Sequence, residues 1–420
     1  MRAHRVSINL LVHLVWLLMF VALLFAQPTV SSQSNQQTNQ QQRPRTVGAN
    51  QNTANQNTNA RPTNQSQPNS PEEVDEGDVV RVETQLVTVP AIVTDKTGRP
   101  MSALRQENFA VFEDGKPQSL TNFATTEAPF EIALLLDTSG STREDLGLIR
   151  DAANAFISAL RAGDRVSVVA FSNERGTNGP VASVDVLTAL TDKRTVLRNA
   201  VANLGTSNGT PFYDALLRVG DQVFHAPPTD QFRGRRAVVA LTDGVDSSSN
   251  SDFAEARTKL SRAGVAAYFI QVSTEDYVED RLLKDCQDDG RLTLSAKQLE
   301  RFRRLFVPSA QREDYQDFCR MGQFERMDIS RQLYNLARRE MGELARATGG
   351  KNFSAASLQE ASAAFAQVAN EIGTQYSLGY YPSDKTRDGR FRQIKVELRG
   401  VKDASVRARD GYYAPKESKQ

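Results

Sequence analysis

The chain of 420 residues contains only two cysteines, Cys286 and Cys319, and only three histidines. Two thiols exclude a scaffold of several disulfides, a four-thiolate zinc site and an iron–sulfur cluster held by this chain alone. His4 and His13 lie in the N-terminal segment, so only His225 is left for a Ser–His or Cys–His pair. The scarcity of both residue types argues against a hydrolase triad.

An excess of charge of either sign is also lacking. The sequence has 51 Lys and Arg against 50 Asp and Glu, a formal net charge of +1 at pH 7. Such a balance provides no basic field for nucleic acid and no acidic field for a cationic partner. We therefore expect no nucleic-acid binding, and the choice of partner must depend on a local site.

The N-terminus carries a long apolar run. Arg2 and Arg5 precede an almost wholly apolar stretch, 10–26, and a polar sequence follows it. This pattern predicts an export signal at residues 1–26, which is either cut after Ala26 or retained as a membrane anchor, since the stretch is near the ~18-residue minimum for spanning a bilayer. The protein is thus expected in the periplasm, the cell envelope or the extracellular space, with membrane contact only through this segment.

Residues 27–78 are rich in Gln, Asn, Ser, Thr and Pro and have no aromatic side chain. Such a segment cannot bury enough surface to offset the entropy lost on ordering, so we expect a disordered linker. A sticky, prion-like segment is the alternative, and the lack of aromatic residues argues against it.

The next segment, 79–127, has short runs of alternating apolar and polar residues. A strand is expected at 86–93, and a hairpin is expected to join 109–112 to 120–123 through Asp114–Gly115. These few strands are not enough for independent stability. The segment therefore needs partners from elsewhere in the chain.

The C-terminal segment, 375–415, shows the same alternation at 376–381 and 391–398, ahead of a short tail, 416–420. We predict that the two flanking segments form one small β-sandwich, and that the region between them is inserted into it as a separate domain.

That central region, 128–374, alternates continuous apolar runs with amphipathic helical patterns. The predicted strands are 130–136, 166–171, 181–187, 237–241 and 265–272, and the predicted helices are 146–160, 194–204, 211–224, 252–262, 329–347 and 358–372. Continuous apolar runs are typical of strands buried on both faces of a parallel sheet. The pattern predicts a doubly wound α/β fold with a mostly parallel, Rossmann-like sheet.

A charge-rich insertion, 273–328, interrupts this alternation. We expect a partly helical lid or arm; a solvated loop with no task is the alternative. The insertion contains both cysteines, and an exported protein meets an oxidising compartment, so a disulfide between Cys286 and Cys319 is predicted rather than two free thiols.

Three polar segments fall where the predicted sheet ends, at the edge where open α/β sheets bind ligands. They are 137–141, Thr210 and Asp243. Each has an ordinary explanation: Ser141 with Glu144 fits a capping box, Thr210 a helix cap, and Asp243 a turn. Their convergence instead favours a divalent-cation site, whose predicted ligands are Asp137, Ser139, Ser141, Thr210 and Asp243.

Two carboxylates and three hydroxyls suit a hard cation, so Mg²⁺ is expected, with Mn²⁺ and Ca²⁺ as alternatives. Neutral hydroxyls leave the ion electrophilic, and an external carboxylate would complete its shell. Asp214 and Asp246 either orient waters bound to the ion or are a helix-face and a loop carboxylate without a role there.

The order Asp–x–Ser–x–Ser, Thr, Asp resembles the metal-ion-dependent adhesion site of the von Willebrand factor A family, over about 128–374. Three segments, Val111–Gly115, Leu135–Ser141 and Arg407–Tyr412, further resemble the bacterial von Willebrand factor A-related, acidobacterial-type group over nearly everything after residue 79.

The resemblance implies that Ser139 and Ser141 bind the ion directly, that Asp137 and Asp243 bind it directly or through water, and that Thr210 changes between these modes when a ligand binds. It also implies that a Glu or Asp of a partner protein completes the shell. The insertion departs from the simplest members of the family, which puts a ligand-triggered movement of the last helix in doubt.

We therefore expect an exported, non-enzymatic module for adhesion or protein binding. A structural component of a cell-envelope complex is the first alternative. A magnesium-dependent phosphoester or peptide hydrolase is the second, although no general base is evident beside the motif.

Overall fold

The computed structural model describes residues 86–125, 129–140, 145–177, 179–282 and 294–416, which belong to one unit, Val80–Gln420. The predicted signal or anchor at 1–26, the linker at 27–78, Ser141 and Cys286 lie outside the described residues and stay predictions. Among the described residues, no helix has the length and apolar character needed to cross a bilayer.

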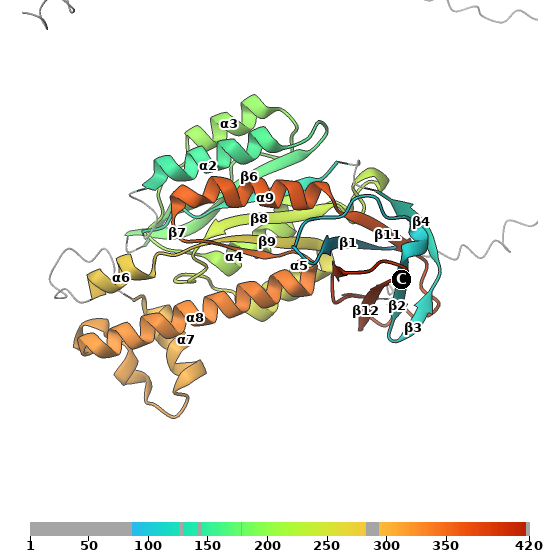
Figure 1. Ribbon diagram of the computed structural model, residues 1–420. Coiled ribbons are helices and arrows are strands. Elements are labelled where there is room, and N and C mark those ends of the chain that lie inside the picture. Colours follow the sequence, from blue (N-terminus) through green and yellow to red (C-terminus); the bar gives the residue numbers. More distant parts are fainter. Residues whose placement is uncertain (1–85, 126–128, 141–144, 178, 283–293, 417–420) are drawn as a thin grey trace, which may run out of the picture. The chain divides into compact units, whose positions relative to one another are not determined.

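A six-stranded sheet in the order β10-β9-β8-β5-β6-β7 forms the centre of this unit (Figure 1). Its strands are β5 (Glu131–Leu136), β6 (Arg165–Gly176), β7 (Gly179–Val186), β8 (Arg236–Thr242), β9 (Val265–Val272) and β10 (Asn352–Ala355). Only the edge strand β7 runs antiparallel to its described neighbour. Every residue of β5, β8 and β9 is buried, as their continuous apolar runs predict.

Helices cover both faces of this sheet (Figure 1). On one face lie α2 (Leu146–Ala159), α3 (Arg194–Ala202) and α9 (Ala361–Gly373); on the other lie α4 (Phe212–Arg218), which continues as a π-helical segment Val219–Val223, α5 (Phe253–Ala263) and α8 (Gln323–Thr348). Alternate residues of β5 enter the two apolar clusters, Leu134 one and Leu135 the other. The doubly wound α/β prediction is confirmed.

Two four-stranded antiparallel sheets stand beside this domain, with strand orders β13-β1-β11-β4 and β14-β12-β2-β3. Their strands are β1 (Val87–Asp95), β2 (Phe109–Glu113), β3 (Lys116–Gln118), β4 (Leu120–Ala124), β11 (Tyr376–Tyr380), β12 (Phe391–Leu398), β13 (Ala404–Ala408) and β14 (Gly411–Tyr413). Each sheet takes strands from both flanking segments, and one apolar cluster joins the two sheets. The predicted composite sandwich is confirmed.

The predicted hairpin has a different second strand. Asp114 and Gly115 both have positive φ, 47° and 78°, as a two-residue turn of the type that suits strand twist requires. The return strand must then begin at once, and Glu113 pairs with Lys116 at the start of β3. The prediction that 109–112 pairs with 120–123 is wrong, because β3 fills that place and β4 pairs with β11 in the other sheet.

A buried carboxylate joins the two ends of the sandwich. Glu113 of β2 accepts hydrogen bonds from the hydroxyls of Tyr380 at 2.7 Å and Tyr412 at 3.0 Å, and from the Arg392 guanidinium at 3.1 Å. The side chains of Glu113 and Arg392 are only 3% and 5% exposed. Glu113 and Tyr412 belong to two of the short segments that carry the acidobacterial-type resemblance, so these segments meet in one hydrogen-bond network.

The insertion has helices and an apolar core of its own. It contains α6 (Glu275–Leu282), α7 (Ala296–Phe306), two 3-10 turns (Arg312–Tyr315 and Phe318–Arg320) and the start of α8. Leu299 and Phe302 of α7 pack in one cluster with Ile329 of α8. Cys319 is disulfide-bonded; Cys286, the only other cysteine of the sequence, lies outside the described residues.

Glu113→Ala is expected to lower the free energy of unfolding by about 3–5 kcal/mol, because it removes the buried carboxylate that pairs with Arg392 and leaves only Asp384, which is 52% exposed and 3.6 Å away. Urea unfolding followed by circular dichroism measures this loss. The matched control is Glu107→Ala, a carboxylate whose side chain is 75% exposed, which should change the value by less than about 0.5 kcal/mol. Equal effects of the two substitutions would refute the assignment.

Candidate metal centre

Asp137 and Asp243 follow two neighbouring parallel strands. Asp137 comes directly after β5 and Asp243 directly after β8, and the register of the strands pairs Leu136 with Leu241. The Asp137 N–H donates to the Leu241 carbonyl at 3.0 Å. Both aspartates are buried, at 1% and 3% exposed. The fold therefore brings the two predicted carboxylates side by side at the carboxyl edge of the sheet.

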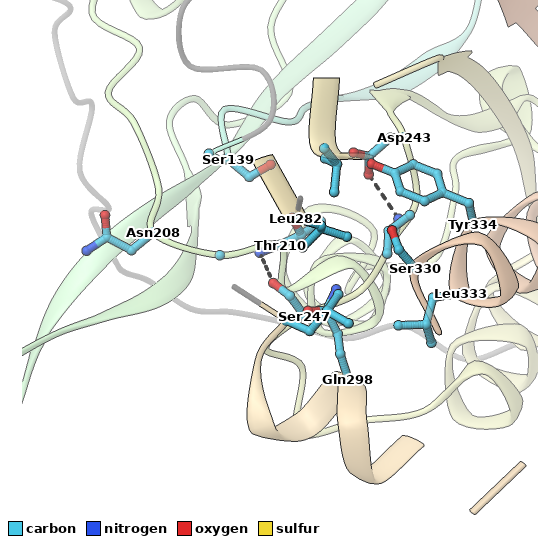
Figure 2. Close-up of a pocket in the computed structure, with 15 residues that line it drawn as sticks. Ser139, Asn208, Thr210, Asp243, Ser247, Leu282, Gln298, Ser330, Leu333 and Tyr334 are labelled. Carbon is cyan, nitrogen blue, oxygen red and sulfur yellow. Dashed lines mark hydrogen bonds between the residues drawn. The ribbon is translucent and has the colours of Figure 1, made fainter. Parts of the chain in front are cut away.

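Ser139 and Thr210 reach the same edge. A pocket of about 110 Å³ is lined there by Ser139, Gly140, Thr210 and Asp243, among other residues (Figure 2). The Ser139 N–H donates to Asp137 Oδ1 at 3.0 Å, which holds the Asp137–Ser139 turn. Of the five predicted ligands, the structure brings these four together; Ser141 lies outside the described residues.

Thr210 is held through its backbone and does not cap the helix that follows. Its N–H donates to Ser247 Oγ at 2.8 Å, and its carbonyl accepts from the Ser247 N–H at 3.0 Å. Helix α4 starts at Phe212, and its N-cap residue is Pro211, which has no side-chain cap. The ordinary explanation of Thr210 as a helix cap is therefore wrong, because Pro211 takes the cap position.

Asp246 supplies the missing cap from another segment. Its Oδ2 accepts from the N–H groups of Phe212 at 2.9 Å and Tyr213 at 3.3 Å. Asp214, in the first turn of α4, accepts in return from the N–H groups of Asn250 and Ser251. Both carboxylates thus fasten α4 to the loop 246–251, and neither lines the pocket among the described residues. Their role in orienting waters stays a hypothesis.

The pKa of Asp137 reflects the burial of the site and the charge of its neighbour Asp243. Burial, and next the charge of Asp243, raise the pKa of Asp137 from 3.8 to about 7. Hydrogen bonds oppose this rise, including one of 2.6 Å from the Thr242 hydroxyl. Two buried carboxylates that repel each other form a site that a divalent cation would stabilise.

The donor set fits a hard cation. It consists of oxygen atoms only, from the carboxylates of Asp137 and Asp243 and the hydroxyls of Ser139 and Thr210. No group of three or more His, Cys, Asp or Glu that could hold a metal occurs among the described residues. The oxygen-only set matches the chemistry of Mg²⁺, which retains waters and takes few protein carboxylates.

Two residues that the sequence analysis missed orient Asp243. The Thr274 hydroxyl, just beyond β9, lies 2.7 Å from Asp243 Oδ2 and 2.7 Å from the Tyr334 hydroxyl of α8. A threonine hydroxyl has one proton to donate. Since Thr274 gives it to the carboxylate, Tyr334 is the donor to Thr274. The position of Thr274 just after a predicted strand could have marked it as a residue near the site. Tyr334 lies within a helical pattern, which gives no such signal.

Comparison with known proteins agrees with this fold. Residues 131–301 match the family model of the von Willebrand factor type A domain. The chain therefore carries a domain of this family, and the resemblance is confirmed at that level. A search of curated proteins gives no match.

Solved structures that match this chain include proximal thread matrix protein 1 from the mussel byssus, with a TM-score of 0.36 and 15% identity over 59% of this chain and 49% of that one. The match thus spans about half of the mussel protein. A von Willebrand factor type A protein from Catenulispora acidiphila has a TM-score of 0.38 and 14% identity over 76% of both chains. The conserved hypothetical protein BatB from Bacteroides thetaiotaomicron has a TM-score of 0.34 and 14% identity over 58% of this chain and 98% of its own.

Without a divalent cation, the Asp137 contribution to the free energy of unfolding should fall as the pH rises from about 4 to about 7. In that window the folded carboxyl, whose pKa is raised, keeps a proton that the unfolded chain has lost, so folding is linked to proton uptake. Added Mg²⁺ requires the ionised form, so its increase in Tm should be larger at pH 8 than at pH 5.5.

Thermal unfolding with and without Mg²⁺ across this pH range tests both effects. Asp137→Asn cannot titrate, and it should flatten the pH dependence of Tm and remove the response to Mg²⁺. An increase in Tm with Mg²⁺ that is equal at both pH values, or that persists in the variant, would contradict the assignment.

Proposed function

We propose that the chain is an exported, non-enzymatic binding module whose von Willebrand factor type A domain engages a carboxylate of a partner protein through a divalent cation. The observation that carries the proposal is the pair of buried, mutually repelling carboxylates, Asp137 and Asp243, placed beside a pocket at the carboxyl edge of the sheet. Export is proposed from the N-terminal apolar run.

Four described residues would hold the cation: Asp137, Ser139, Thr210 and Asp243. The family resemblance adds Ser141. Mg²⁺ is the proposed ion, with Mn²⁺ and Ca²⁺ as alternatives. A cation held there supplies an electrophilic centre that accepts one carboxylate oxygen from outside. The hydroxyls of Thr242 and Thr274 donate to Asp137 Oδ2 and Asp243 Oδ2 and so restrain the two carboxylates.

The surroundings favour binding over hydrolysis. Of the other carboxylates near the site, Asp246 and Asp214 accept from the N–H groups of α4 and of the loop 246–251, and Glu275 is paired with Arg338 at 2.8 Å. His225 follows the π-helical segment beyond α4, while the site lies ahead of the start of α4. Among the described residues, no side chain beside the pocket therefore has the position of a general base for an attacking water.

Mg²⁺ binding should be lost in Asp137→Ala and in Asp243→Ala, while both variants keep the circular dichroism spectrum of the folded chain. Isothermal titration of the full chain measures the ion directly. The control is Asp151→Ala, an exposed carboxylate on α2, which should bind Mg²⁺ like the parent chain. Because the two aspartates supply the charge that balances the dication, losing either should weaken binding by roughly 100-fold or more.

Capture of a partner from envelope extracts then tests the function. We expect capture to be abolished by a chelator and by Ser139→Ala, and to be retained by Asp151→Ala. Capture that is the same with and without chelator would refute a metal-bridged contact, even if Mg²⁺ binds.

A further inference from the structure

The insertion, together with the part of α8 that follows it, builds one side of the pocket at the proposed metal site. The opposite side is the sheet edge, with Ser139, Thr210 and Asp243. Figure 2 shows Ser139 and Thr210 on one side and Ser330, Leu333 and Tyr334 of α8 on the other. The insertion also contributes Val278, Leu282, Leu294 and Gln298. A ligand that fills this pocket would therefore lie against the insertion as well as the sheet edge.

This wall is uncharged, and apart from Gln298, Ser330 and Tyr334 it is apolar. Val278 and Leu282 of α6, with Leu333 of α8, face the pocket and also belong to or pack against the apolar core of the insertion. Asp243 is the only charged side chain among the described residues that line the pocket. A second charge on a ligand would thus be desolvated without a partner, whereas an aliphatic stem would bury apolar surface.

Ser330 is a polar exception in the wall. It is 1% exposed, it lines the pocket, and its Oγ has no hydrogen-bond partner among the described residues. A helical serine ordinarily has a carbonyl one turn earlier as an acceptor, yet no such bond is made here. A buried hydroxyl without a partner costs about 1–3 kcal/mol. The pocket thus contains a donor whose acceptor is missing.

Hydrogen bonds fix the wall to the loop that holds Thr210. Ser295 Oγ, at the start of α7, donates to the Ser247 carbonyl at 2.6 Å, and Lys297 Nζ donates to the Ser248 carbonyl at 2.7 Å. Ser247 is the residue that pairs with the Thr210 backbone. The Arg301 guanidinium of α7 also binds Glu340 of α8, with both side chains largely buried. The wall is therefore preformed next to the site, which lowers the cost of binding.

We infer that the pocket binds a carboxylate carried on a short, uncharged aliphatic stem, such as the side chain of a partner's Glu or a free short-chain monocarboxylate. Ser330 donates a hydrogen bond to the carboxylate, and Val278, Leu282 and Leu333 contact the stem. The volume of about 110 Å³ admits several heavy atoms, since about 10–15 Å³ of such space holds one water. The inference rests on the proposed function, because the cation holds the carboxylate.

The experiment is an NMR titration of the full chain with ¹³C-labelled Val and Leu methyl groups. Mg²⁺ is added first, without any carboxylate, to measure binding of the ion itself. The probes are butyrate, succinate and the blocked peptide acetyl-Gly-Glu-Gly-amide. With Mg²⁺ present, butyrate and the peptide should shift the methyl signals of Val278, Leu282 and Leu333. Succinate has the same carbon skeleton as butyrate but carries a second charge, and should bind roughly 10-fold or more weakly. Tighter binding of the peptide than of butyrate would identify a protein ligand, and the reverse a free acid.

Ser330→Ala should weaken butyrate binding by roughly 3- to 10-fold, while Mg²⁺ affinity is kept and the Tm of the chain without butyrate is unchanged or higher. Ser158→Ala, an exposed serine on α2, should change nothing. The inference is overturned if, with Mg²⁺ bound, butyrate and the peptide fail to bind, leave the three methyl signals unmoved, or bind Ser330→Ala as tightly as the parent chain. Failure of Mg²⁺ itself to bind would instead overturn the proposed function.

Discussion

The repulsion between Asp137 and Asp243 is the constraint around which the central domain is arranged. Parallel pairing of β5 with β8 places the two residues side by side, and burial keeps water from screening them. A fold gains no stability from such a pair by itself. Donors therefore surround it: the Thr242 hydroxyl binds Asp137, and the Thr274 hydroxyl and the Val245 N–H bind Asp243. These bonds hold the carboxylates in place but do not neutralise them, and a bound cation would supply the opposite charge.

The loop 246–251 transmits this geometry to the rest of the domain. Asp246 caps α4, and Ser247 pairs with the backbone of Thr210. The carbonyls of the same loop accept from Ser295 and Lys297 of the insertion. A displacement of α7 would therefore disturb the loop and with it Thr210. The insertion is thus connected to Thr210, one of the proposed ligands, through hydrogen bonds to this loop, and it also contributes to the pocket wall.

Sequence patterns predicted the layers of the fold but not every pairing. Continuous apolar runs identified β5, β8 and β9, because burial on both faces leaves no alternation. Strand β10 has only four residues, too few for a pattern, and β4 took a partner in the other sheet because β3 completed the hairpin. Helix α8 begins six residues before its predicted start, where Arg326 is buried against the ring of Phe318. The motif predicted the four described residues that meet at the sheet edge; the pocket wall depends on the tertiary packing of the insertion, which no local periodicity encodes.

The placement of the sandwich is consistent with the proposal that the insertion chooses the ligand. The flanking strands join the central domain where β5 begins, at Glu131, and where α9 ends, at Gly373. The site lies at the other end of β5, after Leu136, about 20 Å away at ~3.3 Å per strand residue. The Glu113 network binds strands of the sandwich to one another. No described residue of the sandwich lines the pocket. Among the described elements, α6, α7 and the first half of α8 do line the pocket. Under the proposed function, variation in their pocket-facing residues is the route by which such a protein would change its ligand.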